Sequence, residues 1–265
     1  LAGSLAQALG GGVMRCGKPD SLSDWTKKHF ANDDGLVFVG AVGIAVRAIA
    51  PYIEKKWKDP AVVAVDECAQ FAVPLLSGHL GGANRLARAV SEVCGAQAVI
   101  TTATDVNGVF AVDEWARCQG LSVIDPQHIK LISGKLLAGD SVKVYSPYPI
   151  EGECPIGVEA AETLPADVAV SIRQEKAVLL LAPKTVVLGV GCRKATPQST
   201  IESVLERFLQ QNKLHIESIC AVASIDLKKE EPGLIAFCRS HGWEFQTCTA
   251  EELRQVAGEF TPSAF

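Results

Sequence analysis

The stretch that decides the fold is residues 71–90, FAVPLLSGHLGGANRLARAV, in which a strand-like run passes through a glycine-rich turn into a helix-like run. The chain's most conspicuous histidine, His79, lies in that turn, and open α/β sheets bind ligands at the edge where strands give way to helices. Glycines allow close backbone approach and leave amide hydrogens to face an anion or a developing oxyanion. The alternative interpretation is a tight turn with a hydrogen-bonded histidine. The polar flanks Ser77 and Asn84 favour a functional site.

Strand-like and helix-like segments alternate along the chain, which predicts a layered α/β fold with largely parallel sheets. Helices are expected over 42–50, ending at Pro51, over 197–211, with Thr196 as N-cap, and from a capping box at Thr249. Strands are expected over 36–39, 61–65, 71–76, 98–101, 121–124, 141–145, 168–172, 178–181, 185–190, 216–221 and 243–247.

Two stretches suggest domain boundaries. Residues 146–165 are rich in Pro, Gly and Glu and show no period, so we interpret them as loop or linker. A second boundary is expected at 182–184, just before a new strand, glycine turn and helix. We therefore expect a larger N-terminal and central region over 1–145, linker and central-region strands over 146–183, and a smaller C-terminal α/β domain over 184–265.

The composition argues against several classes of protein. At 48% hydrophobic the chain can bury a sizeable core, and no apolar run reaches the roughly eighteen residues that span a bilayer, so we expect no membrane partner. A net charge of −5 with interspersed acids and bases argues against a nucleic-acid partner. Nine cysteines without a C-x-x-C pair predict no metal site and suit a reducing compartment, which we take to be the cytoplasm.

Four blocks of the sequence resemble the cobalt-precorrin-5A hydrolase family (CbiG) of anaerobic cobalamin biosynthesis. They are GIAVRAIAP (43–51), DPAVVAVDE (59–67), the run around His79, and TTATD (101–105). The C-terminal part, with GVGCR (189–193) and ASID (223–226) followed by Lys229 and Glu231, resembles the module that ends those proteins and also occurs alone as a CobE-type protein.

The resemblance implies a definite reaction. The family opens the δ-lactone that the ring A acetate makes with the methylated C20 bridge of cobalt-precorrin-5A, and it releases C20 with its methyl group as acetaldehyde to give cobalt-precorrin-5B. The small-molecule partner is then a cobalt corrinoid whose cobalt belongs to the substrate, and no protein-bound cofactor is implied. The family's N-terminal domain would extend to about residue 103 and its middle domain would start at about 104. The resemblance further implies residues missing before Leu1 and after Phe265, and it leaves a homodimer open.

Lactone hydrolysis needs a nucleophile, a base, oxyanion donors and a proton for the leaving oxygen. His79 is predicted to be the base, because an imidazole with an unperturbed pKa of about 6.5 exchanges protons near working pH. Asp66 and Glu67, at the end of the strand over 61–65, would orient that imidazole or act as the base themselves. The alternative for these two residues is a solvated pair at a strand end.

The glycine-rich turn also offers candidates for the other roles. The amides of Gly81 and Gly82 would hold the oxyanion. Ser77 is a weaker candidate for the nucleophile, because LLSGH lacks the outer glycines of the G-x-S-x-G elbow.

A macrocycle fringed with acetate and propionate groups needs forked cationic donors, and Arg47 is the first candidate. Exposed basic residues can also simply solvate a surface. We expect the His79 turn and the Gly189–Arg193 turn to open onto one cleft. The full predicted substrate-binding set is Gly43, Arg47, Gly78, Gly81, Gly82, Asn84, Arg85, Thr101, Thr102, Thr104, Asp105, Gly189, Gly191 and Arg193.

Two other functions use the same residues. A non-catalytic carrier would bind corrinoid intermediates through the same arginines and glycine turns. Nucleotide binding would draw on Gly189-Val190-Gly191 after a strand, but Lys194 takes the place of the third glycine of the dinucleotide fingerprint.

Overall fold

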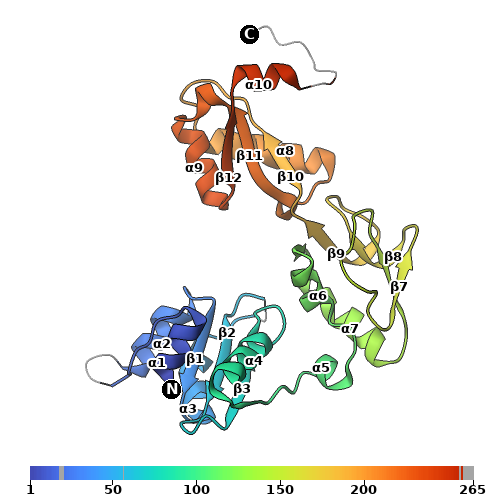
Figure 1. Ribbon diagram of the computed structural model, residues 1–265. Coiled ribbons are helices and arrows are strands. Elements are labelled where there is room, and N and C mark those ends of the chain that lie inside the picture. Colours follow the sequence, from blue (N-terminus) through green and yellow to red (C-terminus); the bar gives the residue numbers. More distant parts are fainter. Residues whose placement is uncertain (18–20, 56, 257, 259–265) are drawn as a thin grey trace. The chain divides into compact units, whose positions relative to one another are not determined.

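The predicted alternation of strands and helices is confirmed by the computed structural model, an α/β structure whose strands pair largely in parallel. The structure describes residues 1–17, 21–55, 57–256 and 258, and within them the strands form three sheets. Its helices and strands are labelled in Figure 1. The chain divides into two compact units. The first unit comprises Leu1–Cys118, Pro126–Val142 and Glu153–Val158, and the second comprises Gln119–Asp125, Lys143–Gly152 and Glu159–Phe265.

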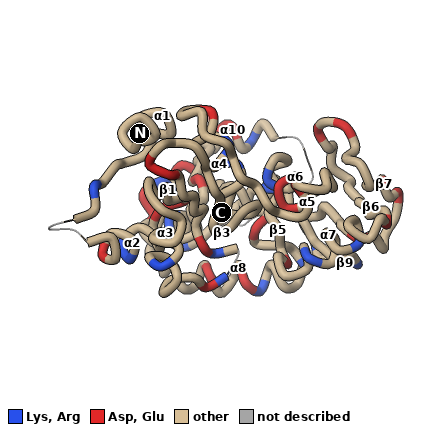
Figure 2. Tube along the Cα trace, turned by 90° about the horizontal axis from the view of Figure 1, so that it is seen from below, with Lys and Arg blue, Asp and Glu red and all other residues tan. Residues whose placement is uncertain are grey.

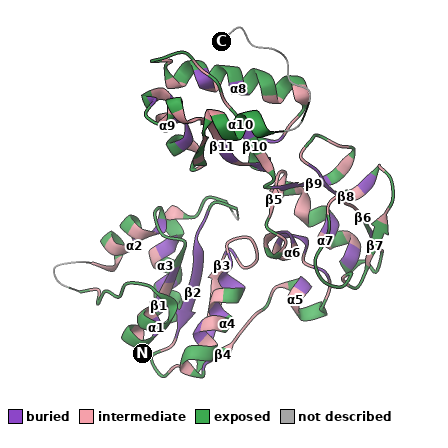
Figure 3. Ribbon diagram, turned by 45° about the horizontal axis from the view of Figure 1, so that its top comes forward, coloured by how far each residue is buried: buried purple, intermediate pink, exposed green. Residues whose placement is uncertain are grey.

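The first sheet has the strand order β1-β2-β3-β4, and β2 (Ala61–Val65) is its most buried strand. Every residue of β2 is buried, as its purple colour in Figure 3 shows. β1 (Gly35–Val39) runs parallel to β2, and β3 (Phe71–Leu76) runs antiparallel to β2. The short β4 (Gln97–Ala98) continues the sheet parallel to β3.

Helices cover both faces of this sheet because alternate residues of a strand point to opposite faces. Val62 packs against α2 (Leu22–Phe30) and α3 (Val42–Ile49), which the short helix η1 (Ala50–Tyr52) follows. Val63 packs on the other face against α1 (Ala2–Leu9) and α4 (Ala83–Cys94). The buried strand thus sits between two helical layers.

The remaining helices of the first unit follow β4 along the chain. They are α5 (Ala103–Asn107), α6 (Val112–Cys118), η2 (Pro126–His128) and α7 (Ile129–Leu137). Gly108 caps the C-terminal end of α5, and its φ of 61° lies in the left-handed region. This turn allows the chain to enter α6, which carries a residue of the candidate site.

The second sheet has the order β5-β9-β8-β6-β7, and its edge strand β7 (Val158–Ala161) lies in the stretch expected to be loop. The four residues VEAA show no apolar alternation, and none of them is buried, so the sequence carries no strand pattern there. The other strands are β5 (Leu121–Val123), β6 (Val142–Tyr145), β8 (Ala166–Val170) and β9 (Ala177–Pro183).

The third sheet is fully parallel, with the order β10-β11-β12. Its strands are β10 (Val186–Gly189), β11 (Ile219–Ile225) and β12 (Glu244–Cys248). Helices α8 (Gln198–Asn212) and α9 (Pro232–His241) pack on it through a core that contains Phe237 and Leu234. The short helices η3 (Ile216–Ser218) and η4 (Asp226–Lys228) flank β11, and α10 (Ala250–Gln255) begins at the predicted capping box.

The predicted boundary at 182–184 falls at the end of β9, the last strand of the second sheet along the chain, and backbone hydrogen bonds cross it. The His215 amide donates to the Ile172 carbonyl at 2.9 Å, and the Gln174 amide donates to the Lys213 carbonyl at 2.9 Å. These bonds keep both sheets in the second compact unit. Residues 257 and 259–265 of the predicted C-terminal domain lie outside the described residues.

Candidate active site

The turn between β3 and α4 uses its own carbonyls to cap the helix. The amide of Gly82 donates to the His79 carbonyl at 2.8 Å. The amide of Ala83 donates to the Ser77 carbonyl at 3.0 Å, and the amide of Asn84 donates to the Gly78 carbonyl at 2.9 Å. The prediction that the Gly82 amide binds an oxyanion is therefore wrong, because that hydrogen is already donated. The φ of 83° at Gly82 explains why glycine occupies the position.

Ser77 is a structural residue of this turn. It adopts a positive φ of 59°, and its hydroxyl donates to the Asp59 carbonyl at 2.9 Å. A side chain on Gly81 would come 2.3 Å from Ser77 Cβ, so the turn closes only around a glycine. A hydroxyl that is buried and donated to a backbone carbonyl does not act as a nucleophile, which corrects the weaker prediction for Ser77.

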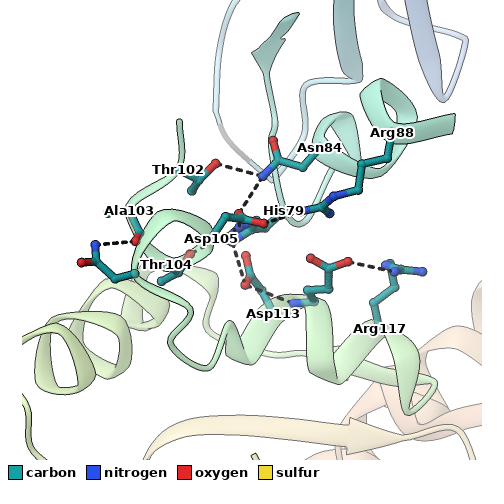
Figure 4. Close-up of polar contacts among 11 residues, drawn as sticks. His79, Asn84, Arg88, Thr102, Ala103, Thr104, Asp105, Asp113 and Arg117 are labelled. Carbon is teal, nitrogen blue, oxygen red and sulfur yellow. Dashed lines mark hydrogen bonds and ion pairs between the residues drawn. The ribbon is translucent and has the colours of Figure 1, made fainter. Parts of the chain in front are cut away.

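His79 points from this turn toward α5 and α6, where two carboxylates face its ring nitrogens (Figure 4). Nε2 lies 2.6 Å from Asp105 Oδ2, and Nδ1 lies 3.3 Å from Asp113 Oδ1. Thr104 Oγ1 lies 3.4 Å from Nε2. The three charged side chains are only 11%, 16% and 8% exposed for His79, Asp105 and Asp113, so little water screens their interaction.

A second layer of contacts fixes Asp105. The buried Asn84 donates through Nδ2 to Asp105 Oδ2 at 3.0 Å and to Thr102 Oγ1 at 2.9 Å. Arg88, one turn along α4 from Asn84, donates to Asp105 Oδ1 at 2.7 Å. Its side chain is 46% exposed, so Arg88 connects the buried histidine cluster to the surface.

The carboxylates raise the pKa of His79 from its ordinary 6.5 to about 9. The hydrogen bond with Asp113 has the largest effect, burial of the ring opposes it, and the hydrogen bond and charge of Asp105 add to it. Burial alone raises the pKa of Asp105, but hydrogen bonds and charges from His79 and Arg88 outweigh it and lower that pKa. The expectation of an ordinary pKa for His79 is therefore wrong. At neutral pH the ring is an imidazolium, which can donate a proton but cannot take one from water.

Asp66 and Glu67 lie at the opposite end of β3 from His79. β2 and β3 are antiparallel, so the turn after β2 lies beside the start of β3, and six strand residues at about 3.3 Å each place it roughly 20 Å from the His79 turn. The prediction that Asp66 or Glu67 orients His79 is wrong for this reason. The Asp66 carboxylate instead accepts hydrogen bonds from the amides of Phe71 (2.6 Å), Gln70 (2.8 Å) and Cys68 (2.9 Å), and the Phe71 bond is the main cause of its lowered pKa.

Gly43 and Arg47 lie on α3, which begins at the end of the sheet opposite to the His79 turn. The Gly40 amide donates to the Val65 carbonyl at 2.7 Å, which places the start of α3 beside the end of β2. Arg47 is exposed and has no charged partner among the described residues. Its role in binding substrate stays a prediction.

The other predicted binding residues fall into two groups. Gly78, Asn84, Arg85, Thr101, Thr102, Thr104 and Asp105 belong to the His79 turn, α4 and the segment before and within α5. Of these, Asn84, Thr102, Thr104 and Asp105 are brought together with His79, whereas Arg85 and Thr101 are exposed and make none of these contacts. Gly189, Gly191 and Arg193 lie at the end of β10 and in the loop after it, in the second compact unit, and the shared cleft stays a prediction.

Asp113 is the residue of the candidate site that the sequence did not reveal. It lies in the first turn of α6, where an acidic residue is ordinary, and its own carboxylate accepts the Glu114 amide at 3.1 Å. Only the folded position of α6 brings it to His79. What distinguishes Asp113 is that it is a buried charged residue in a short helix, and burial cannot be seen from the sequence alone.

Neither a metal cluster nor a membrane helix occurs in the part of the chain that the structure describes. No three His, Cys, Asp or Glu side chains there are arranged to hold a metal ion. No helix there combines the length and the apolar character needed to cross a bilayer.

Comparison with known proteins places the chain in a family. Residues 24–105 match the family model for the cobalamin synthesis G N-terminal domain, and residues 186–265 match that for the cobalamin synthesis G C-terminus. Cobalt-precorrin-5A hydrolase from Salmonella typhimurium is 38% identical over 260 residues, which cover 92% of this chain and 74% of that protein. The chain belongs to the cobalt-precorrin-5A hydrolase family.

Two further comparisons concern the same family. Cobalt-precorrin-5A hydrolase from Priestia megaterium is 30% identical over 86% of this chain and 67% of its own length. A solved structure from Sulfolobus solfataricus, described as a homologue of cobalamin biosynthesis protein G, covers 99% of this chain and 79% of its own at 22% identity and a TM-score of 0.46. His79 and Asp105 lie within the matched N-terminal domain, and Asp113 lies beyond it.

Proposed function

We propose that the chain hydrolyses cobalt-precorrin-5A, opening its δ-lactone and releasing acetaldehyde to give cobalt-precorrin-5B. The observation that carries this proposal is the 38% identity to the Salmonella enzyme over 92% of the chain. The cobalt ion is part of the substrate in this proposal, and the protein supplies no cofactor. A cytoplasmic location follows as part of the same proposal.

His79 serves this reaction as a proton donor. Water attacks the lactone carbonyl, the bond between that carbon and the C20 oxygen breaks, and the leaving oxygen must gain a proton. Both N–H groups of the imidazolium face carboxylates, so the leaving oxygen receives the proton by displacing one of them, and the contact of Nδ1 with Asp113, at 3.3 Å, is longer than that of Nε2 with Asp105, at 2.6 Å. The freed C20 hydroxyl then returns its proton to the now neutral His79 imidazole, C20 and its methyl group leave as acetaldehyde, and the macrocycle keeps the electron pair of the broken carbon–carbon bond.

The residues around His79 hold Asp105 against its Nε2 atom. Asp105 is held in place by Asn84 and Arg88, so it cannot rotate away from Nε2 without breaking their hydrogen bonds. Arg88 is half exposed and already oriented, which makes it a candidate contact for an acetate or propionate of the substrate. In this proposal Asp105 bridges the substrate-binding Arg88 and the proton donor His79.

The same geometry also suits a carrier that binds corrinoids without reacting, and one experiment separates the two functions. The purified chain is incubated with cobalt-precorrin-5A, and acetaldehyde is measured by its reduction with alcohol dehydrogenase and NADH. We expect acetaldehyde in proportion to the enzyme and over many turnovers. Binding of the corrinoid without acetaldehyde above the enzyme-free control contradicts the hydrolase and supports the carrier.

A further inference from the structure

A buried carboxylate, Glu231, holds a loop of the C-terminal module in place, far along the sequence from His79. Its side chain is 6% exposed and comes just before α9. One oxygen accepts the Ala195 amide at 2.6 Å, and the other lies 3.4 Å from Lys228 Nζ. A carboxylate this deeply buried needs polar partners, and these two contacts supply them. The contact with Ala195 ties the loop over residues 190–197, between β10 and α8, to the start of α9.

Other contacts also hold this loop. The Ser224 hydroxyl donates to the Val190 carbonyl at 2.7 Å. Ala195 adopts a positive φ of 59°, which the hydrogen bond to Glu231 maintains. The first turn of α9 lies so close that a side chain at Gly233 would come 2.0 Å from the Thr196 carbonyl oxygen.

This loop and the segment before Glu231 present cations that lack carboxylate partners. Arg193 and Lys194 are exposed on the loop, and Lys229 is exposed two residues before Glu231. Among the described residues none of the three forms an ion pair, whereas the neighbouring Lys228 is paired with Glu231. Acidic and basic segments are interspersed along the chain (Figure 2), so three unpaired cations in neighbouring loops are a local feature.

The carboxylates of the same region do not form ion pairs with these cations. Asp226 and Glu230 lie on the segment that carries Lys229, but neither forms an ion pair with it. Glu252 is engaged at its helix start, where it accepts the Thr249 amide at 2.7 Å. The three parallel strands β10, β11 and β12 end at this edge of their sheet, which is where open α/β sheets bind ligands.

We propose that Arg193, Lys194 and Lys229 form a binding surface for the carboxylates of a corrinoid, and that Glu231 is the positioning residue that holds the loop for them. The ligand class rests on the function proposed above, since a corrinoid acid carries several acetate and propionate groups on one rigid ring. Spaced cations on a fixed loop match such a ligand because neither partner loses much conformational freedom on binding.

Binding of cobyrinic acid, a stable corrinoid polycarboxylic acid, tests the surface, and its fully methylated ester is the uncharged control ligand. Absorbance or calorimetric titration compares the full chain with the variant Arg193→Met/Lys194→Met/Lys229→Met. The matched control is Arg207→Met, which removes an exposed arginine from α8 whose Nε donates to the Ser203 carbonyl within the same helix. We expect about tenfold weaker binding of the acid in the triple variant, unchanged binding of the ester, and wild-type behaviour in the control.

Glu231→Ala tests the positioning role through the ratio of the affinity for cobyrinic acid to the affinity for its methyl ester. We expect that ratio to fall with all three surface cations still present, an effect that a general loss of stability does not produce. Unchanged acid binding in the triple variant, an equal loss for the ester, or no acid binding by the wild type overturns the proposal. Acetaldehyde release is scored separately: a chain that binds the acid through these residues but releases none contradicts the hydrolase and leaves the binding surface supported.

Discussion

Two carboxylates face the ring nitrogens of His79, and they make the free energy of unfolding depend on pH. In the folded chain the pKa of His79 is about 9, above its ordinary 6.5 in an unfolded chain. The folded state therefore binds this proton more tightly, and the stabilisation is fully present below pH 6.5 and is lost as the pH rises through 9. At about 1.4 kcal/mol per pKa unit, the upper limit is about 3 kcal/mol.

We predict that the difference in unfolding free energy between the wild type and His79→Gln is largest near pH 6 and shrinks by pH 9.5. Glutamine retains hydrogen bonding but does not titrate, so other groups cancel in the comparison. Urea unfolding at pH 6, 7.5 and 9.5 measures this difference. A difference that stays constant across these pH values contradicts the assignment of an imidazolium.

Arg47 gives a second prediction at this scale, because it is exposed on α3 and has no charged partner among the described residues. Arg47→Lys keeps the charge but loses the planar fork, so corrinoid binding should weaken by about 1–3 kcal/mol if Arg47 clamps a carboxylate. Titration with cobyrinic acid measures the change. A lower melting temperature with unchanged affinity would show that Arg47 is structural.

Single residues also show what sequence can reveal about a site. His79, Asn84 and Asp105 could be chosen because each lies in a short polar segment next to a strand or helix end. The pairing of His79 with Asp113 could not be predicted, because the contact spans thirty-four residues and depends on where α6 packs. The pKa of His79 was missed for the same reason, since it depends on that unseen partner.

At the scale of elements, the turn between β3 and α4 depends on close backbone packing rather than on hydrogen bonding alone. A methyl group on Gly81 would meet Ser77 Cβ at 2.3 Å, and Ser77 is held by its hydrogen bond to Asp59. Gly134, in the exposed middle of α7, has no atom within 4 Å of such a methyl group. The two glycines therefore provide a matched pair.

We predict opposite effects on stability from the same substitution at these two positions. Gly81→Ala should lower the free energy of unfolding by about 2 kcal/mol or more, because the turn must open. Gly134→Ala should raise it by up to about 1 kcal/mol, through the better helix propensity of alanine. Urea unfolding measures both values. A neutral Gly81→Ala contradicts the packing described for the turn.

Elements with a strong local pattern could be predicted, and their pairing could not. The buried run AVVAV gave β2 with correct bounds, and the capping box at Thr249 gave the start of α10. The antiparallel pairing of β3 was missed, because the turn at residues 66–70 contains no local hairpin signal and an α/β pattern favours parallel strands. At α8 the N-cap is Pro197 rather than Thr196, since the Thr196 hydroxyl donates instead to the Arg193 carbonyl.

For the whole molecule, the α/β class followed from alternation along the chain, whereas the grouping of its parts depends on contacts between distant segments. Residues 172 and 174 form backbone hydrogen bonds with residues 215 and 213, so the central strands and the C-terminal sheet belong to one unit despite the boundary signal between them. Both matched family domains and the His79 cluster occur in this one chain.

The most direct test of the account is the rate of acetaldehyde release from cobalt-precorrin-5A by the His79→Ala variant, with corrinoid binding measured in parallel. If His79 supplies the proton in lactone opening, turnover should fall by about a hundredfold or more while the corrinoid still binds. Acetaldehyde release by the folded variant at the wild-type rate would contradict the account and leave His79 as a structural residue that joins the turn to α5 and α6.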